Sequence, residues 1–229
     1  FRRFQADKLP REARNSCFAV ACDPANADHM WGSFGTWGRN MGVIAQTFDG
    51  GNTWEPLGST GESESGLPGV RHRALFLAGV RKPMLYCSAD DYGVFASPDG
   101  GETWLSRNSG LPHLGVRGLL AAPRNGDQLW CVLGKKGGHA GAVFMSTDGA
   151  ETWTCVSGDR PFGDVKNVVV AQGEKPRLYV ASRVSALDGE TIPGGVFRSD
   201  DEGCTWEHVF ADDFVEGLAV DPRDPDVVY

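Results

Sequence analysis

Aromatic and charged side chains gather in four loops, most of them glycine-rich, that each join two apolar segments. The first loop carries Trp37 and Arg39, and such a pair could stack on a sugar ring and donate hydrogen bonds to it. The third holds two lysines and a histidine, and the fourth holds Asp188 and Glu190. We expect these four side chains to contact a glycan or other polar ligand, although Trp37 could instead pack against a neighbouring part of the fold.

Basic residues recur at equivalent places before the apolar segments of the chain. The aligned positions are Phe18, Arg73, Arg117, Lys166 and Glu216. A guanidinium group matches a carboxylate in shape and charge, so the three consecutive basic residues could attract an anionic group of a ligand. Solvated charges at strand ends are the commoner explanation of such positions. Both interpretations stay open.

A repeated sequence motif indicates which strands and turns position these residues. The pattern Ser/Thr-x-Asp-x-Gly-x-Thr-Trp occupies residues 47–54, 97–104, 146–153 and 199–206. Each copy follows a short β-branched or aromatic run, as at a hairpin turn, where an Asp side chain accepts backbone hydrogen bonds and glycine takes a positive φ. The third copy has Ala150 at the second glycine position, which costs about 1 kcal/mol if φ is positive there.

We expect the recurring positions of the motif to stabilise the turns and not to take part in catalysis. The residues concerned are Asp49, Trp54, Asp99, Trp104, Asp148, Trp153, Asp201 and Trp206. In a four-stranded antiparallel unit the motif lies at the end opposite to the four variable loops. We therefore do not interpret the four motif aspartates as catalytic acids.

A second periodicity completes the repeat. Aromatic residues follow aliphatic ones by 11 positions in every repeat, as in Leu75 with Tyr86 and Leu119 with Trp130, with turn-forming residues between them. Each repeat then reads as four antiparallel strands, which predicts an all-β fold, a β-propeller of four-stranded antiparallel blades with four full repeats and part of a fifth. We treat residues 1–229 as a single partial propeller, with units near 18–66, 73–110, 117–160, 166–212 and, incomplete, 216–229.

The motif and its period resemble the Asp-box, or BNR-repeat, propellers, and the resemblance spans nearly the whole chain. This group includes sialidases, xyloglucan-degrading glycoside hydrolases, sortilin-type receptors and a photosystem II assembly factor. The Asp-Pro-x-x-Pro style of residues 221–229 is most similar to the xyloglucanase-like branch. A shared fold leaves the activity open, because these members differ in function.

The xyloglucanase-like resemblance implies a pair of carboxylates across a cleft. That branch has an Asp-x-Gly-Gly stretch with a catalytic aspartate, and Asp90 matches it in spacing, with Asp91 beside it and Tyr92 in place of the first glycine. The resemblance implies a second carboxylate from Asp164, Asp188, Glu190 or blades outside this chain. The sialidase branch would use arginines for a substrate carboxylate, but we find no Arg-Ile-Pro motif. A noncatalytic scaffold for protein interaction is the alternative.

Composition limits the partners that we expect. The formal net charge is −8 and the basic residues are scattered, which argues against a nucleic-acid partner. No apolar run approaches the ~18 residues of a membrane span. No Cys/His cluster has zinc spacing, so we expect no metal and no cofactor, and we interpret the six cysteines as small buried residues.

The chain ends indicate a section of a larger ring, because there is no initiator Met and the fifth unit stops after two strands. We expect the missing blades of the same chain to cover exposed blade edges. The compartment stays unknown, although the resemblance implies a lean towards secreted or periplasmic proteins.

Overall fold

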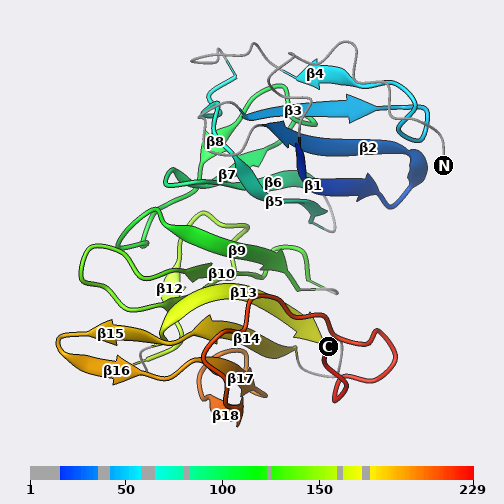
Figure 1. Ribbon diagram of the computed structural model, residues 1–229. Coiled ribbons are helices and arrows are strands. Elements are labelled where there is room, and N and C mark those ends of the chain that lie inside the picture. The colour runs from blue at the N-terminus through cyan, green and yellow to red at the C-terminus, as the bar shows by residue number, and fades with distance from the viewer. Residues whose placement is uncertain are drawn as a thin grey trace. The chain divides into compact units, whose positions relative to one another are not determined.

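The computed structural model describes residues 16–35, 42–57, 65–79, 83–122, 125–158, 162–171 and 176–229. These residues form four four-stranded antiparallel sheets and one additional two-stranded hairpin, and the described part of the chain contains no helix (Figure 1). The predicted all-β class with four-stranded antiparallel sheets is confirmed. The chain divides into two compact units, Phe1–Arg107 and Asn108–Tyr229, each with two of the sheets.

Unit 1 contains the first two sheets, and in both of them the strands follow one another in chain order. The first sheet consists of β1 (Ser16–Asp23), β2 (Asn26–Gly35), β3 (Gly42–Thr47) and β4 (Glu55–Leu57). The second consists of β5 (His72–Ala78), β6 (Met84–Ala89), β7 (Gly93–Ser97) and β8 (Leu105–Ser106). The two sheets share one core, which includes Trp31, Ile44, Phe95 and Trp104.

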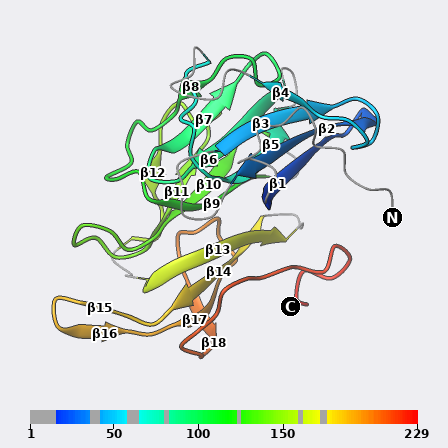
Figure 2. The same cartoon turned by 45° about the horizontal axis from the view of Figure 1, so that its top comes forward.

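Unit 2 repeats this plan with one addition. Its first sheet consists of β9 (Val116–Ala121), β10 (Leu129–Leu133), β11 (Ala142–Ser146) and β12 (Thr154–Cys155). Its second sheet consists of β13 (Asp164–Ala171), β14 (Arg177–Arg183), β17 (Gly195–Ser199) and β18 (Glu207–Phe210), and the added hairpin is formed by β15 (Ser185–Leu187) and β16 (Glu190–Ile192). Figure 2 shows this hairpin extending beyond the sheet to which it is joined.

The proportion of apolar residues in a strand follows the degree to which that strand is buried. The inner strands β6 and β10 are almost wholly buried, and their sequences are correspondingly rich in apolar residues. The core of unit 2 includes Trp130, Val143, Phe162, Phe197 and Trp206, with the ring of Phe162 edge-on to those of Phe197 and Trp206.

The four motif turns share one set of hydrogen bonds. In the first, Asp49 Oδ1 accepts from Thr47 Oγ1 at 2.8 Å and from the backbone N–H of Thr53 at 2.9 Å, while Thr53 Oγ1 donates to Asp49 Oδ2 at 2.7 Å. The same three bonds occur around Asp99, Asp148 and Asp201. The aspartates therefore close their own turns.

The glycine positions of these turns have the backbone conformation that the motif predicts. Gly51, Gly101 and Gly203 have positive φ, and so does Ala150, at 67°. The motif tryptophans are buried, and the indoles of Trp54, Trp104 and Trp206 donate to the carbonyls of these same glycines at 2.7 to 3.1 Å.

The aromatic residues of the second strands link one repeat to the next. Trp31 in β2 donates its indole N–H to the carbonyl of Gly100, in the motif turn of the next sheet, at 2.7 Å. Trp130 in β10 donates to Glu202 in the same way at 3.0 Å. An aromatic ring with one polar atom suits this position, because the ring packs in the core while the N–H satisfies a turn carbonyl.

The expectation that all six cysteines are buried is wrong. Cys87 and Cys131 lie in the buried inner strands, whereas Cys17, Cys22, Cys155 and Cys204 are exposed. The exposed ones lie in the first or last strands of sheets or in a motif turn, where less of the core covers them. All six are free thiols.

Candidate functional site

The first strand of each four-stranded sheet carries a bulge at the same place. The pairing register shifts between Cys17 and Ala19, between His72 and Ala74, opposite Val132 and Leu133, and between Val165 and Asn167. The extra residues are Phe18, Arg73, Arg117 and Lys166. A bulge inserts one unpaired residue, bends the strand locally and changes the direction of the side chain at that position.

This register corrects one feature of the sequence analysis. The recurring basic residues were expected just before the first strand, but Arg73, Arg117 and Lys166 lie inside β5, β9 and β13. The physical reason is that a bulged residue breaks the apolar alternation and so reads as a residue outside the strand.

In unit 1 the bulged Arg73 forms an ion pair with Asp90, which follows the end of β6. Arg73 Nε binds Asp90 Oδ1, and its Nη2 lies 3.3 Å from Oδ2. Arg71 binds the same carboxylate, with Nε at 2.7 Å and Nη2 at 2.5 Å from Oδ2. Two guanidinium groups thus face one carboxylate, which gives this cluster a net charge of +1. Phe18 lies beneath Arg71, with the guanidinium carbon 5.7 Å from the ring centroid.

A buried histidine, His72, lies between the two arginines in the chain, at the start of β5. His72 Nε2 lies 3.1 Å from the carbonyl oxygen of Pro68, and its Nδ1 lies 3.3 Å from Ser33 Oγ. Because a carbonyl only accepts, Nε2 carries the proton and Nδ1 can accept from the serine. Burial lowers the pKa of His72 to about 4, against the smaller opposing effects of the Pro68 hydrogen bond and the Asp90 charge. The ring is therefore neutral at pH 7.

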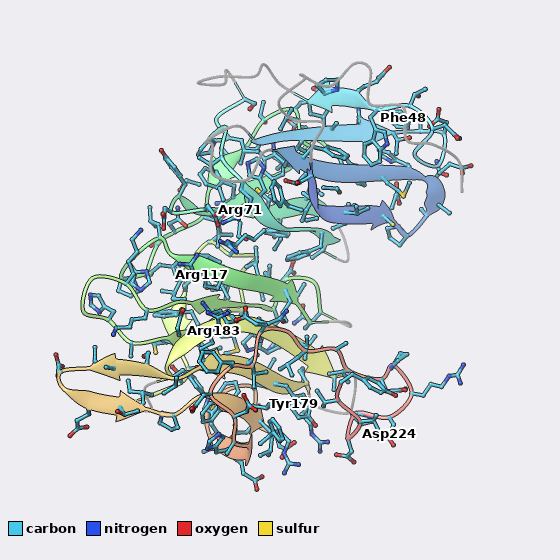
Figure 3. The ribbon with its side chains drawn as sticks, viewed as in Figure 1. Phe48, Arg71, Arg117, Tyr179, Arg183 and Asp224 are labelled. Carbon is cyan, nitrogen blue, oxygen red and sulfur yellow. The ribbon has the colours of Figure 1, made fainter. Side chains whose placement is uncertain are left out.

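The turn after Asp90 presents its side chains to solvent. Asp91 has a φ of 62° and is exposed, and Tyr92 is 46% exposed. The backbone N–H of Tyr92 donates to the carbonyl of Ala89 at 3.0 Å and closes the turn. Asp90 precedes β7 and Asp99 follows it, so the candidate carboxylate and the motif turn lie at opposite ends of one strand. In Figure 3 Arg71 and Phe48, which belongs to the first motif turn, likewise lie at opposite ends of unit 1.

In unit 2 the corresponding basic residues have different partners. Lys166 pairs with Asp164, two residues earlier in β13. Arg183, at the end of β14, pairs with Glu216, and its guanidinium lies 5.9 Å from the ring centroid of Phe214. Arg117 pairs with no carboxylate among the residues that the structure describes. Figure 3 shows Arg117 beside β9 and Arg183 beside β14.

The remaining predicted ligand-binding residues lie apart from these pairs. Asp188 and Glu190 are exposed in the turn of the β15–β16 hairpin, where Asp188 and Gly189 both have positive φ. Lys135, from the loop after β10, donates to the carbonyl of Ala186 in that hairpin. Trp37 and Arg39 lie outside the described residues.

A cavity of about 300 Å³ opens beside the loop after β10 in unit 2. Its lining includes His113, Leu133, His139 and Phe144, and the two histidine rings are 5.7 Å apart. Within the described residues, no group of three or more potential ligands is arranged to hold a metal ion. No helix in this part of the chain is long and apolar enough to cross a membrane.

Comparison with known proteins identifies the fold. No protein-family model matches the chain. A xyloglucanase from Paenibacillus sp. is 26% identical over 138 residues, which are 56% of this chain and 13% of that protein.

Solved structures give a longer match. The chain superposes on the GH74 enzyme of Niastella koreensis with a TM-score of 0.72 at 21% identity, covering 94% of this chain and 33% of that one. The GH74 xyloglucanase from Xanthomonas campestris gives 0.68 at 17% identity, with coverage of 93% and 34%. A structure described as YCF48 bound to D1 peptide gives 0.57 at 16% identity, with coverage of 93% and 59%. The chain therefore has the fold of the xyloglucanase-type β-propellers and spans about a third of the length of the two GH74 structures.

Proposed function

We propose that this chain is a section of a glycan-binding propeller and that Asp90 is a carboxylate acting on the bound glycan. The observation that carries the proposal is the fixed position of Asp90 at the end of β6, where Arg71 and Arg73 hold both of its oxygens. A reacting carboxylate has to be held in one orientation, and two guanidinium groups supply that restraint. The similarity to xyloglucanases supports a glycan as the ligand.

The hydrogen bonds decide which role Asp90 can take. A protonated carboxylic acid presents an O–H that needs an acceptor, whereas both arginines offer only donors. Asp90 therefore suits the base or nucleophile of a glycosidase pair, and another residue must protonate the leaving oxygen.

The test is hydrolysis of xyloglucan oligosaccharides, with cello-oligosaccharides for comparison, followed by product analysis. Asp90→Asn keeps the size of the side chain and removes the charge, and we expect it to abolish hydrolysis while calorimetry still detects binding. Asp99→Asn is the matched control, because Asp99 lies at the other end of the adjacent strand and closes a turn. Unchanged turnover in the Asp90 variant would remove Asp90 from the reaction, and wild-type chain that neither binds nor cleaves any glycan would contradict the whole proposal.

A noncatalytic protein-interaction scaffold is the second candidate. The observation that favours it is that both oxygens of Asp90 already accept hydrogen bonds from the two arginines, which leaves less room for a substrate. One structure of the same fold is described as bound to a peptide. This alternative predicts saturable binding on a peptide array with no response on a glycan array, the reverse of the first proposal.

A further inference from the structure

The motif turns of the second and fourth sheets are each seated against the sheet that precedes them in the same unit. In unit 1, the indole N–H of Trp31 donates to the carbonyl of Gly100, the fourth residue of the second motif copy. In unit 2, the indole of Trp130 donates to the carbonyl of Glu202, the fourth residue of the last copy. The same point of the turn is therefore bound by a second-strand aromatic residue in both units.

Two aliphatic side chains enclose the fifth motif residue in each of these contacts. A Cβ atom added to Gly101 would lie 2.8 Å from Leu57 of the preceding sheet and 3.5 Å from Leu85 of its own sheet. The corresponding neighbours of Gly203 in unit 2, at 2.7 and 3.6 Å, are Val156 and Leu178. In both units the first neighbour comes three residues after a motif tryptophan, and the second comes one residue before a second-strand aromatic residue.

The last sheet of unit 2 has aliphatic residues at both of these positions, and there they line a groove. Val209 comes three residues after the motif tryptophan of this sheet, and Val228 precedes Tyr229, the aromatic residue of the incomplete fifth unit. Both valines line a cavity of about 450 Å³ together with Tyr179, the second-strand aromatic residue of the sheet. Tyr179 donates its hydroxyl to the carbonyl of Pro225 at 2.9 Å, and Val209 is 40% exposed (Figure 3).

The residues beside this groove also provide the edge of a strand. Residues 219–221 and 227–229 pair as antiparallel strands, with reciprocal backbone hydrogen bonds of 2.8 and 2.9 Å between Ala219 and Tyr229. Because backbone groups alternate in direction along a strand, the N–H and C=O of Val228 point to the opposite side. A further strand can therefore pair with the 227–229 edge.

We propose that this groove is a docking seat for a β-hairpin of another polypeptide that carries the eight-residue motif. The strand before its turn would pair with residues 227–229 and place the first motif residue opposite Val228, as Ser199 is placed opposite Leu178. Its fifth motif residue would lie between Val209 and Val228. That residue has to be glycine, because an added Cβ atom collides with the preceding sheet in both of the other contacts.

The argument for this occupant is the repetition of the contact within the chain. An aromatic residue and two aliphatic residues hold a motif turn in unit 1 and again in unit 2, and the groove presents the same three positions. Covering exposed apolar side chains provides the driving force for docking. This inference is independent of the reaction proposed for unit 1.

The experiment titrates the full chain with a synthetic peptide that has the sequence of residues 93–107, a complete strand, motif turn and strand. Binding is followed by calorimetry, and hydrogen exchange of the Val228 amide reports pairing at the strand edge. We expect saturable one-to-one binding and slower exchange of this amide. The same peptide with Gly101→Val places a branched side chain against Val209 and should bind at least about tenfold more weakly.

The Val209→Asp variant tests the groove from the side of the protein. Val209 lies in the last strand of its sheet and is partly exposed, so the charge should leave the fold intact and weaken peptide binding at least about tenfold. Leu105→Asp is the matched control, because Leu105 is 48% exposed in the last strand of another sheet, and it should leave the affinity unchanged. Circular dichroism checks the folding of both variants.

Three results would overturn the proposal. The first is the absence of peptide binding to the wild-type chain. The second is unchanged affinity both for the Gly101→Val peptide and in the Val209→Asp chain. The third is a stable dimer in sedimentation that Val209→Asp dissociates, with no peptide binding, which would assign the groove to a second copy of the chain.

Discussion

The buried His72 makes the stability of unit 1 depend on pH in a window that no motif carboxylate controls. Its neutral imidazole donates to Pro68 and lies against Ser33, and burial lowers its pKa to about 4 from the ordinary 6.5. In the unfolded chain the imidazole binds a proton near pH 6.5, whereas in the folded chain it does so only near pH 4. Between these values the unfolded state holds more protons, so stability falls as the pH falls.

The size of the effect follows from the difference between the two pKa values. A difference of about 2.5 units at roughly 1.4 kcal/mol per unit corresponds to about 3 kcal/mol of unfolding free energy. The full contribution is present above pH 6.5, it is lost progressively down to pH 4, and it changes no further below that value. A loss of this size is a large fraction of the stability of an ordinary domain.

The assay is urea unfolding followed by tryptophan fluorescence at several pH values between 7 and 4. The His72→Gln variant keeps an N–H donor for Pro68 and does not titrate, so its unfolding free energy should change by about 3 kcal/mol less than that of the wild type over this range. NMR titration of the wild-type His72 ring gives the folded pKa directly. An identical pH slope in the two proteins, or a ring that titrates near pH 6.5, would refute the reasoning.

Three further predictions concern the motif turns. Hydrogen bonds within the turn, first of all the one from the backbone N–H of Thr53, hold the pKa of Asp49 at about 2. The folded protein should therefore lose stability as the pH falls from about 4 towards 2. The Asp49→Asn variant should lose less stability in the same acid titration. Gly203→Ala should lower the unfolding free energy by about 2 to 4 kcal/mol, because φ is 104° and the new Cβ would lie 2.7 Å from Val156. Gly51→Ala introduces no such clash and should lower it by only about 1 kcal/mol. Both values can be measured by thermal or urea unfolding. Equal costs would contradict the steric part of this account. Ala150→Gly should change stability by less than about 1 kcal/mol, because relief at a φ of 67° is offset by the loss of a buried methyl group, and a large change in either direction would count against that balance.

The repeat could be predicted from the sequence because its signals are local. The motif turns combine fixed residue types at fixed spacing, and the strands between them are short apolar runs, so the four-stranded sheets follow from pattern alone. The pairing of Leu119 with Cys131 and of Val168 with Val180 matches the aligned columns of the repeats. The hairpin around Asp188 was also within reach, because Asp-Gly between two short segments is a strong hairpin signal, but this segment is treated in the sequence analysis only as a loop.

The candidate site was less predictable because it depends on register and on contacts between strands. A bulge is a property of two paired strands, and nothing in the sequence of β5 by itself shows that Arg73 is the extra residue. The second arginine on Asp90 was missed for a similar reason. Arg71 lies outside the aligned column, and only the chain path from the end of β6 back to the start of β5 brings it to the carboxylate.

The bulge in each first strand provides one position whose side chain can change without disturbing the pairing on which folding of the repeat depends. Because the bulged residue stands outside the in-and-out alternation of the strand, its replacement leaves the apolar residues on both sides in register with their partners. Phenylalanine, arginine and lysine all occur there within this one chain, and the inner-strand residues opposite the bulge are buried in all four sheets. A duplicated gene segment could therefore acquire a new ligand preference at this single codon without losing the ability to fold.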